Sequence, residues 1–119
     1  MRILRQSCFS NTNTFLGRKI IFEGGVTKPG FDISKLKATM DDFYEAILEY
    51  DKNDKTPYRL TSQNIKSRIK VDEVLWNTDY FKPGKIFLEI YFVDSKTGLT
   101  YSFRFDSPSD PVEVEYCFD

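Results

Sequence analysis

Residues 85–105, KIFLEIYFVDSKTGLTYSFRF, constrain the fold more than any other stretch of the chain. Two runs rich in β-branched and aromatic residues flank Ser95-Lys96-Thr97-Gly98, and this arrangement predicts a β-hairpin. Gly98 is expected to take the left-handed backbone conformation that such a loop requires. Asp94 then pairs with Leu99, and the register of both strands follows by counting outward from that pair.

This register sorts the hairpin side chains onto two faces, because directly opposed residues share a face. One face is apolar, and we expect it to form the core with Ile86, Leu88, Ile90, Phe92, Leu99, Tyr101, Phe103 and Phe105. The other face is mixed and carries Phe87, Glu89, Tyr91, Val93, Thr100, Ser102 and Arg104. Glu89 lies opposite Arg104, which predicts an ion pair between them. A shift by one residue would bury Arg104, so the register is well specified.

Residues 32–50 predict one long amphipathic helix. Apolar residues recur there at helical spacing, at Ile33, Leu36, Met40, Phe43, Tyr44, Ile47 and Leu48. Asp32 or Ser34 can cap its first turn, and the polar run that begins at Asp51 marks its end. We expect the apolar stripe of this helix to pack on the apolar face of the hairpin.

The C-terminal residues predict a strand that continues the hairpin as a β-meander. Val112, Val114, Tyr116 and Phe118 alternate with Glu113, Glu115 and Cys117, which predicts that the two glutamates join the mixed face. Residues 18–23 and some part of 2–9 are further expected strands. Residues 61–76 fit either a helix or a strand, and we favour a short helical turn leading into a strand near 69–76.

Together these patterns predict an α+β fold in a single domain over residues 1–119, with one long helix on an antiparallel sheet of about five or six strands. No apolar run is long enough to cross a bilayer, and Arg5 and Gln6 interrupt the segment where a signal peptide would be apolar. We therefore expect a cytoplasmic protein without a membrane partner. In that compartment Cys8 and Cys117 would stay reduced, unless the terminal strands are neighbours and bring them together.

The composition excludes several kinds of chemistry. The chain has no histidine and two cysteines, so it offers neither a histidine-dependent catalytic triad nor a tetrahedral zinc site. The loop that begins at Asp51 departs from a calcium loop, because Lys55, Thr56 and Ser62 replace a ligand, the glycine and the final glutamate. The carboxylate pair Asp72-Glu73 has no partner groups for acid–base catalysis nearby in the sequence. We expect no enzyme activity, no cofactor and no metal.

The charges are divided unevenly along the chain. Residues 1–70 hold 13 basic and 8 acidic residues, whereas residues 71–119 hold 4 basic and 10 acidic residues. This division favours a dipolar molecule with a carboxylate-rich surface near its C-terminal strands. A basic cluster, Arg59, Lys66, Arg68 and Lys70, lies in the first part of the chain.

We therefore expect a non-enzymatic protein that binds and inhibits another protein with a basic surface. The predicted contact residues are Phe87, Glu89, Tyr91, Arg104, Asp110, Glu113 and Glu115. The most concrete version is an immunity protein that neutralises a nuclease-type toxin, because nuclease clefts are positively charged and acidic residues compete for them. Two alternatives stay open: a nucleic-acid-binding module that uses basic residues 59–70, and an accessory subunit of a larger assembly.

Overall fold

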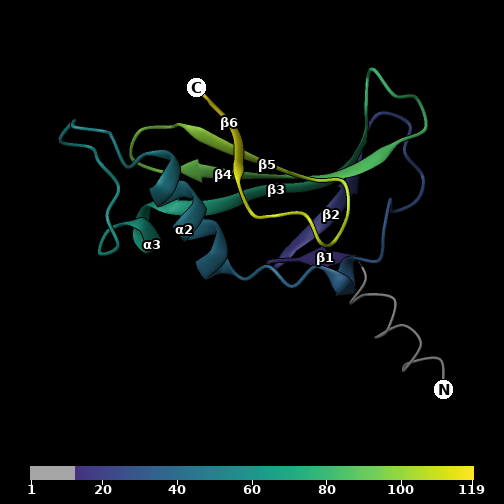
Figure 1. Cartoon of the computed structure of the whole chain (residues 1–119), viewed down its shortest axis with the longest axis horizontal. Helices are drawn as coiled ribbons and strands as arrows, with labels where there is room; N and C mark the ends of the chain where they lie inside the picture. Colours follow the sequence, from purple (N-terminus) through teal and green to yellow (C-terminus); the bar gives the residue numbers. More distant parts are fainter. Residues whose placement is uncertain (1–12) are drawn as a thin grey trace.

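The computed structural model describes residues 13–119, which form a six-stranded, mostly antiparallel sheet with helical segments packed on one face (Figure 1). The strands are β1 Thr14–Phe15, β2 Arg18–Phe22, β3 Ile69–Thr78, β4 Ile86–Asp94, β5 Thr100–Phe105 and β6 Val114–Phe118. They lie in the sheet in chain order, and β2 and β3 are the parallel pair. The predicted α+β class and the number of strands are confirmed, and the described residues form one compact domain, whereas the prediction of a wholly antiparallel sheet missed the parallel pair.

The β4–β5 hairpin has the predicted register throughout. Leu88 pairs with Phe105, Ile90 with Phe103 and Val93 with Thr100. At the turn, the Asp94 amide donates to the Leu99 carbonyl at 2.8 Å, and Gly98 has a φ of +79°. All the predicted core residues of the hairpin lie in the core cluster or pack against it.

The predicted long helix is wrong, because the chain leaves the helical conformation between Leu36 and Thr39. A 3₁₀ turn, η1, covers Ile33–Lys35, and the α-helix α2 covers Met40–Tyr50. A capping box restarts the helix: the Thr39 side chain accepts from the Asp42 amide, and the Asp42 carboxylate accepts from the Thr39 amide at 2.8 Å. These local bonds give the amides of Thr39, the N-cap residue, and Asp42, in the first turn of α2, an acceptor each, and make a separate N-terminus favourable.

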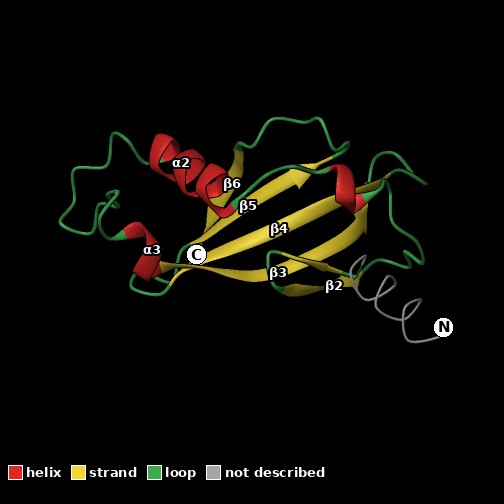
Figure 2. Ribbon diagram, turned by 90° about the horizontal axis from the view of Figure 1, so that it is seen from below, coloured by secondary structure: helices red, strands yellow, loops and turns green. Residues whose placement is uncertain are grey.

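The apolar stripe of the broken helix still packs on the predicted face of the sheet. The ring of Phe43 on α2 lies 5.0 Å from the ring of Phe92 and 4.9 Å from the ring of Phe103, measured between centroids. Ile47, one helical turn later, is also fully buried. Figure 2 shows α2 near β5 and β6, and the contacts between α2 and β6 agree with this view. We call the face of the sheet that carries Phe92 and Phe103 the inner face.

Residues 61–76, which fit either a helix or a strand, contain a short helix followed by a strand, as predicted. A single helical turn, α3 Ile65–Arg68, leads directly into β3 (Figure 2). Arg68 at the end of α3 pairs with Asp94 at the end of β4, with side chains that are 11% and 2% exposed. This buried ion pair ties the start of β3 to the β4–β5 turn.

Two expectations concern residues outside the described part of the chain. The strand predicted within residues 2–9 and the position of Cys8 relative to Cys117 both lie there. Cys117 itself is a free, half-buried thiol, and burial raises its pKa. Within residues 13–119, no helix is long and apolar enough to cross a membrane.

Candidate protein-binding surface

A β-bulge in β6 decides which of its side chains point away from α2. Phe103 pairs with Val114, but Ser102 pairs with Tyr116, so Glu115 has no partner on β5. The alternation of faces therefore changes after Val114. Tyr116 and Phe118 lie on the face opposite α2, where regular alternation predicts the side chain of Cys117. The predicted faces of Tyr116, Cys117 and Phe118 are therefore wrong.

We call the face turned away from α2 the outer face. It carries Leu75, Phe87, Glu89, Tyr91, Ser102, Arg104, Tyr116 and Phe118. The ring centroid of Phe118 lies 5.9 Å from that of Tyr91 and 5.5 Å from that of Tyr116. Tyr116 and Phe118 are 41% and 42% exposed. Among residues 13–119, the buried side chains of η1, α2 and α3 all belong to the core cluster, and no helix covers this aromatic group.

Phe87 is not the exposed aromatic residue that the sequence predicts. It is 6% exposed, and the guanidinium carbon of Arg104 lies 3.8 Å from its ring centroid. Arg104 in turn pairs with Asp79 at 2.8 Å and with Asp106 at 2.9 Å. The stacked guanidinium covers the ring, and its two carboxylate partners hold it there.

The predicted ion pair between Glu89 and Arg104 is therefore wrong, although the two residues are opposite each other as expected. Hydrogen bonds with Asp106 and Asp79 raise the pKa of Arg104, despite its partial burial. The register of a strand pair determines which residues are neighbours. The direction of a long side chain depends on the other charges within its reach.

The centre of the outer face is closely packed. Glu89 is 7% exposed, and Ser102 is fully buried with no hydrogen-bond partner for its hydroxyl among the described residues. The small Ser102 lies between Tyr91 and Tyr116, its neighbours on either side. Burial and the nearby Glu89 carboxylate raise the pKa of Tyr91, so its phenol stays protonated. The centre of this face is therefore largely closed to solvent. Its margin along β6 is accessible, and on the opposite margin Ile21 of β2, the partner of Leu75, is 42% exposed.

That margin continues into a shallow hollow lined by carboxylates. Arg104, Asp106, Asp110, Glu113 and Glu115 are among the residues around this hollow of about 410 Å³. Four of the seven predicted contact residues therefore lie together. The Asp106 amide donates to Asp110 at 2.7 Å, and this bond lowers the pKa of Asp110 and keeps it ionised.

Glu115, the unpaired residue of the bulge, lies among other charges. Partial burial raises its pKa, the nearby Arg104 lowers it, and Glu89 and Asp106 raise it further. A cation brought to this hollow by a partner would relieve the repulsion among these carboxylates.

Only part of the basic cluster predicted over residues 59–70 is free to bind nucleic acid. Arg68 is held by Asp94 through two hydrogen bonds of 3.1 and 2.6 Å. Lys66 lies 3.9 Å from Asp41, with both side chains largely exposed. Arg59 and Lys70 are exposed.

Several aromatic residues are exposed that the sequence did not single out: Phe22, Tyr50, Tyr58, Tyr80, Phe81, Tyr116 and Phe118. Tyr116 and Phe118 were assigned to the inner face, and no sequence signal marks the bulge that turns them outward. Tyr80 and Phe81, at the tip of the β3–β4 hairpin, are 89% and 86% exposed. Their place before Lys82-Pro83-Gly84, a turn sequence, was a signal that could have identified an exposed tip.

Within residues 13–119, no group of three potential ligands is arranged to hold a metal ion. No family model matches the chain, and no characterised protein or solved structure matches it. The function must therefore be argued from the surface described above.

Proposed function

We propose that this chain is a non-enzymatic inhibitor that binds another protein through the β6 margin of its outer face. The most concrete form is an immunity protein for a basic, nuclease-type toxin. The observation that carries the proposal is the bulge at Glu115, which presents Tyr116 and Phe118 beside Glu113 and Glu115. Exposed aromatic area next to carboxylates suits a partner that offers both apolar contacts and positive charge.

The electrostatic argument favours a nuclease among basic partners. An enzyme that binds nucleic acid needs a positive cleft, because its substrate carries one negative charge per phosphate. A surface with Asp110, Glu113 and Glu115 can occupy such a cleft and accelerate association by steering. The aromatic rings would then slow dissociation, because burying them removes apolar area from water.

The test is capture from an extract of the native host, followed by an inhibition assay on the captured protein. Three forms of the chain are compared: wild type, Glu113→Lys with Glu115→Lys, and the control Glu23→Lys with Asp72→Lys. The control makes the same change in net charge at exposed positions on the β2 and β3 side of the sheet. We expect wild type and control to bind and inhibit a basic protein that degrades nucleic acid. The Glu113/Glu115 variant should bind it more than tenfold more weakly, with an unchanged melting temperature.

A second variant, Tyr116→Ala with Phe118→Ala, tests the aromatic part without changing charge. Equal binding by all variants would overturn the proposed surface. Capture of a protein without nuclease activity would contradict the immunity role but not the proposed binding surface. Salt-dependent retention of nucleic acid that depends on Arg59 and Lys70 would favour the nucleic-acid-binding alternative, and co-purification with sister subunits would favour an accessory subunit.

A further inference from the structure

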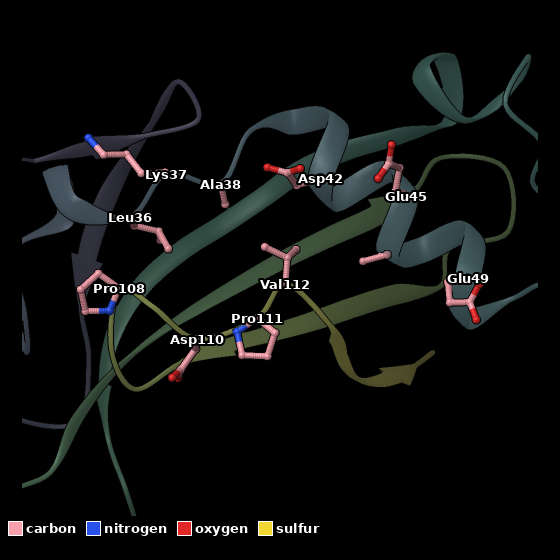
Figure 3. Close-up of a pocket in the computed structure, with 11 residues that line it drawn as sticks. Leu36, Lys37, Ala38, Asp42, Glu45, Glu49, Pro108, Asp110, Pro111 and Val112 are labelled. Atoms are coloured by element: carbon pink, nitrogen blue, oxygen red, sulfur yellow. The ribbon is translucent and has the colours of Figure 1, made fainter.

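A second surface lies on the other side of the β5–β6 loop, where α2 and the loop enclose a groove of about 690 Å³ (Figure 3). Its floor includes Ala38, Ala46, Pro111 and Val112. Leu36, Lys37 and Ala38, in the segment between η1 and α2, also line the groove.

Acidic residues occur on both sides of the groove. Asp42, Glu45 and Glu49 follow one another along α2 at spacings of three and four residues, so they share one side of the helix. Figure 3 shows them along α2, with Asp110 and Pro111 on the loop opposite. The three α2 residues span about 10 Å along the helix axis.

Few cations neutralise this row. Lys37 is the basic residue that lines the groove, and Lys52 pairs with Glu49 at 2.6 Å while both side chains stay largely exposed. Glu45 has no ion pair among the described residues. An apolar floor between acidic sides is complementary to a segment with small apolar residues on one side and cations on the other.

We propose that this groove binds a basic amphipathic helix of a protein partner. Its apolar side covers Ala46 and Val112, and its lysines or arginines, spaced by three or four residues, face Asp42, Glu45 and Glu49. This is the helix-in-groove mode of recognition with charge selection added. The inference does not rest on the inhibitor role, because its main contacts lie on α2, although Asp110 and Pro111 in the β5–β6 loop border both surfaces.

A synthetic peptide of about 15 residues provides the probe. It contains lysine, alanine and leucine, with the lysines on one side of a helix and a fluorescent label at one end. Binding is measured by fluorescence polarisation, and the contact residues are mapped by ¹⁵N–¹H NMR titration of the full chain. The matched control peptide has glutamate at every lysine position. We expect saturable binding of the lysine peptide, shifts that cluster on α2 and residues 108–112, and no binding of the glutamate peptide.

Two variants separate a groove from a general attraction between opposite charges. Glu45→Lys with Glu49→Lys reverses the charge of two of the three acidic residues on α2. Ala46→Phe fills the floor of the groove without changing its charge. Both should weaken binding at least tenfold, whereas Glu115→Lys and the Glu23→Lys/Asp72→Lys control should change it less than threefold. Circular dichroism and thermal melting verify that each variant is folded.

Several results would overturn the proposal. They are the absence of saturable binding, shifts centred on Tyr116 and Phe118, or equal binding of the two peptides. Unchanged binding by Ala46→Phe would also overturn it, because the attraction would then need no groove. Weakening by Glu115→Lys as large as that by the α2 variant would show that the peptide binds the outer-face margin instead.

Discussion

Breaking the buried ion pair between Arg68 and Asp94 should destabilise the domain more than any exposed charge change. The Asp94 carboxylate accepts from Arg68 Nε at 3.1 Å, from Arg68 Nη2 at 2.6 Å and from the Lys96 amide at 2.9 Å. With side-chain exposures of 11% and 2%, neither group can be rehydrated without opening the turn. Asp94→Asn leaves the guanidinium without a counter-charge, and we expect a loss of about 3–5 kcal/mol in the free energy of unfolding.

A double-mutant cycle isolates the pair from other effects of each substitution. Arg68→Met should cost a similar amount, because it leaves a buried carboxylate without a counter-charge, held by hydrogen bonds from Lys96 and Thr97. The double variant should cost clearly less than the two single losses together, with a coupling of about 2–3 kcal/mol. The assay is urea unfolding followed by tryptophan fluorescence, since Trp76 is buried in the core. Additivity to within about 0.5 kcal/mol would refute a cooperative buried pair.

The pair at Glu49 and Lys52 supplies the control. Its N–O distance is the same, 2.6 Å, but its side chains are 71% and 59% exposed. Lys52→Met should therefore change the free energy of unfolding by no more than about 0.5 kcal/mol. A loss comparable to that of Asp94→Asn would show that burial is not what gives the Arg68–Asp94 pair its energy.

The same pair predicts a pH dependence. Burial opposes ionisation of Asp94, but its hydrogen bonds with Arg68, Lys96 and Thr97 outweigh this and lower its pKa below the usual 3.8. Because the folded-state pKa lies below the unfolded one, the stabilisation is complete above the unfolded pKa and is lost as the pH falls through the folded pKa. Unfolding curves recorded below pH 4 should show a steeper loss for wild type than for Asp94→Asn.

Four further substitutions test the packing by urea unfolding. Phe103→Ala should cost about 3–5 kcal/mol, because the ring is fully buried; a loss below about 1 kcal/mol would contradict the inner-face assignment. Ser102→Ala should be neutral or stabilise by about 1 kcal/mol, since it removes a buried hydroxyl without a partner. Gly30→Ala should destabilise by about 1–3 kcal/mol, because its Cβ would lie 2.5 Å from the Ile86 carbonyl oxygen. Thr39→Ala should cost about 1 kcal/mol through loss of the cap, whereas an unbroken helix would gain from the same change.

The hairpin could be predicted from sequence because two independent signals agree. The alternation of apolar residues fixes which residues share a face, and Gly98 fixes where the chain turns. Both depend on short-range chemistry, and the observed pairs match in full. The short helix before β3 also followed from local pattern, since Ile65 is buried as a helical residue and Ile69 as the first residue of a strand.

The errors arise where local hydrogen bonds or neighbouring charges override periodicity. Leu36 and Met40 continue the apolar stripe at helical spacing, but the cap at Thr39 interrupts the backbone between them. Periodicity reports which side is buried and does not report whether the backbone is continuous.

The candidate surface shows the same limit. A single unpaired residue, Glu115, exchanged the faces of Tyr116 and Cys117, and apolar alternation alone does not reveal a bulge. Arg104 turned away from its strand partner Glu89 to Asp106, two residues later in the chain, and to Asp79, just after the end of β3. The acidic residues near β6 were identified from sequence, but their aromatic neighbours depended on three-dimensional detail.

Binding by the outer face requires that Tyr116 and Phe118 point away from α2, and NMR measures this directly. The bulged register predicts cross-strand contacts of Ser102 with Tyr116 and of Tyr101 with Cys117, together with nuclear Overhauser effects between the rings of Phe118 and Tyr91. A regular register would instead place Tyr116 opposite Tyr101, and the side chains of Tyr116 and Phe118 would then point to the inner face. Contacts of that second kind would contradict the surface on which the proposed function rests.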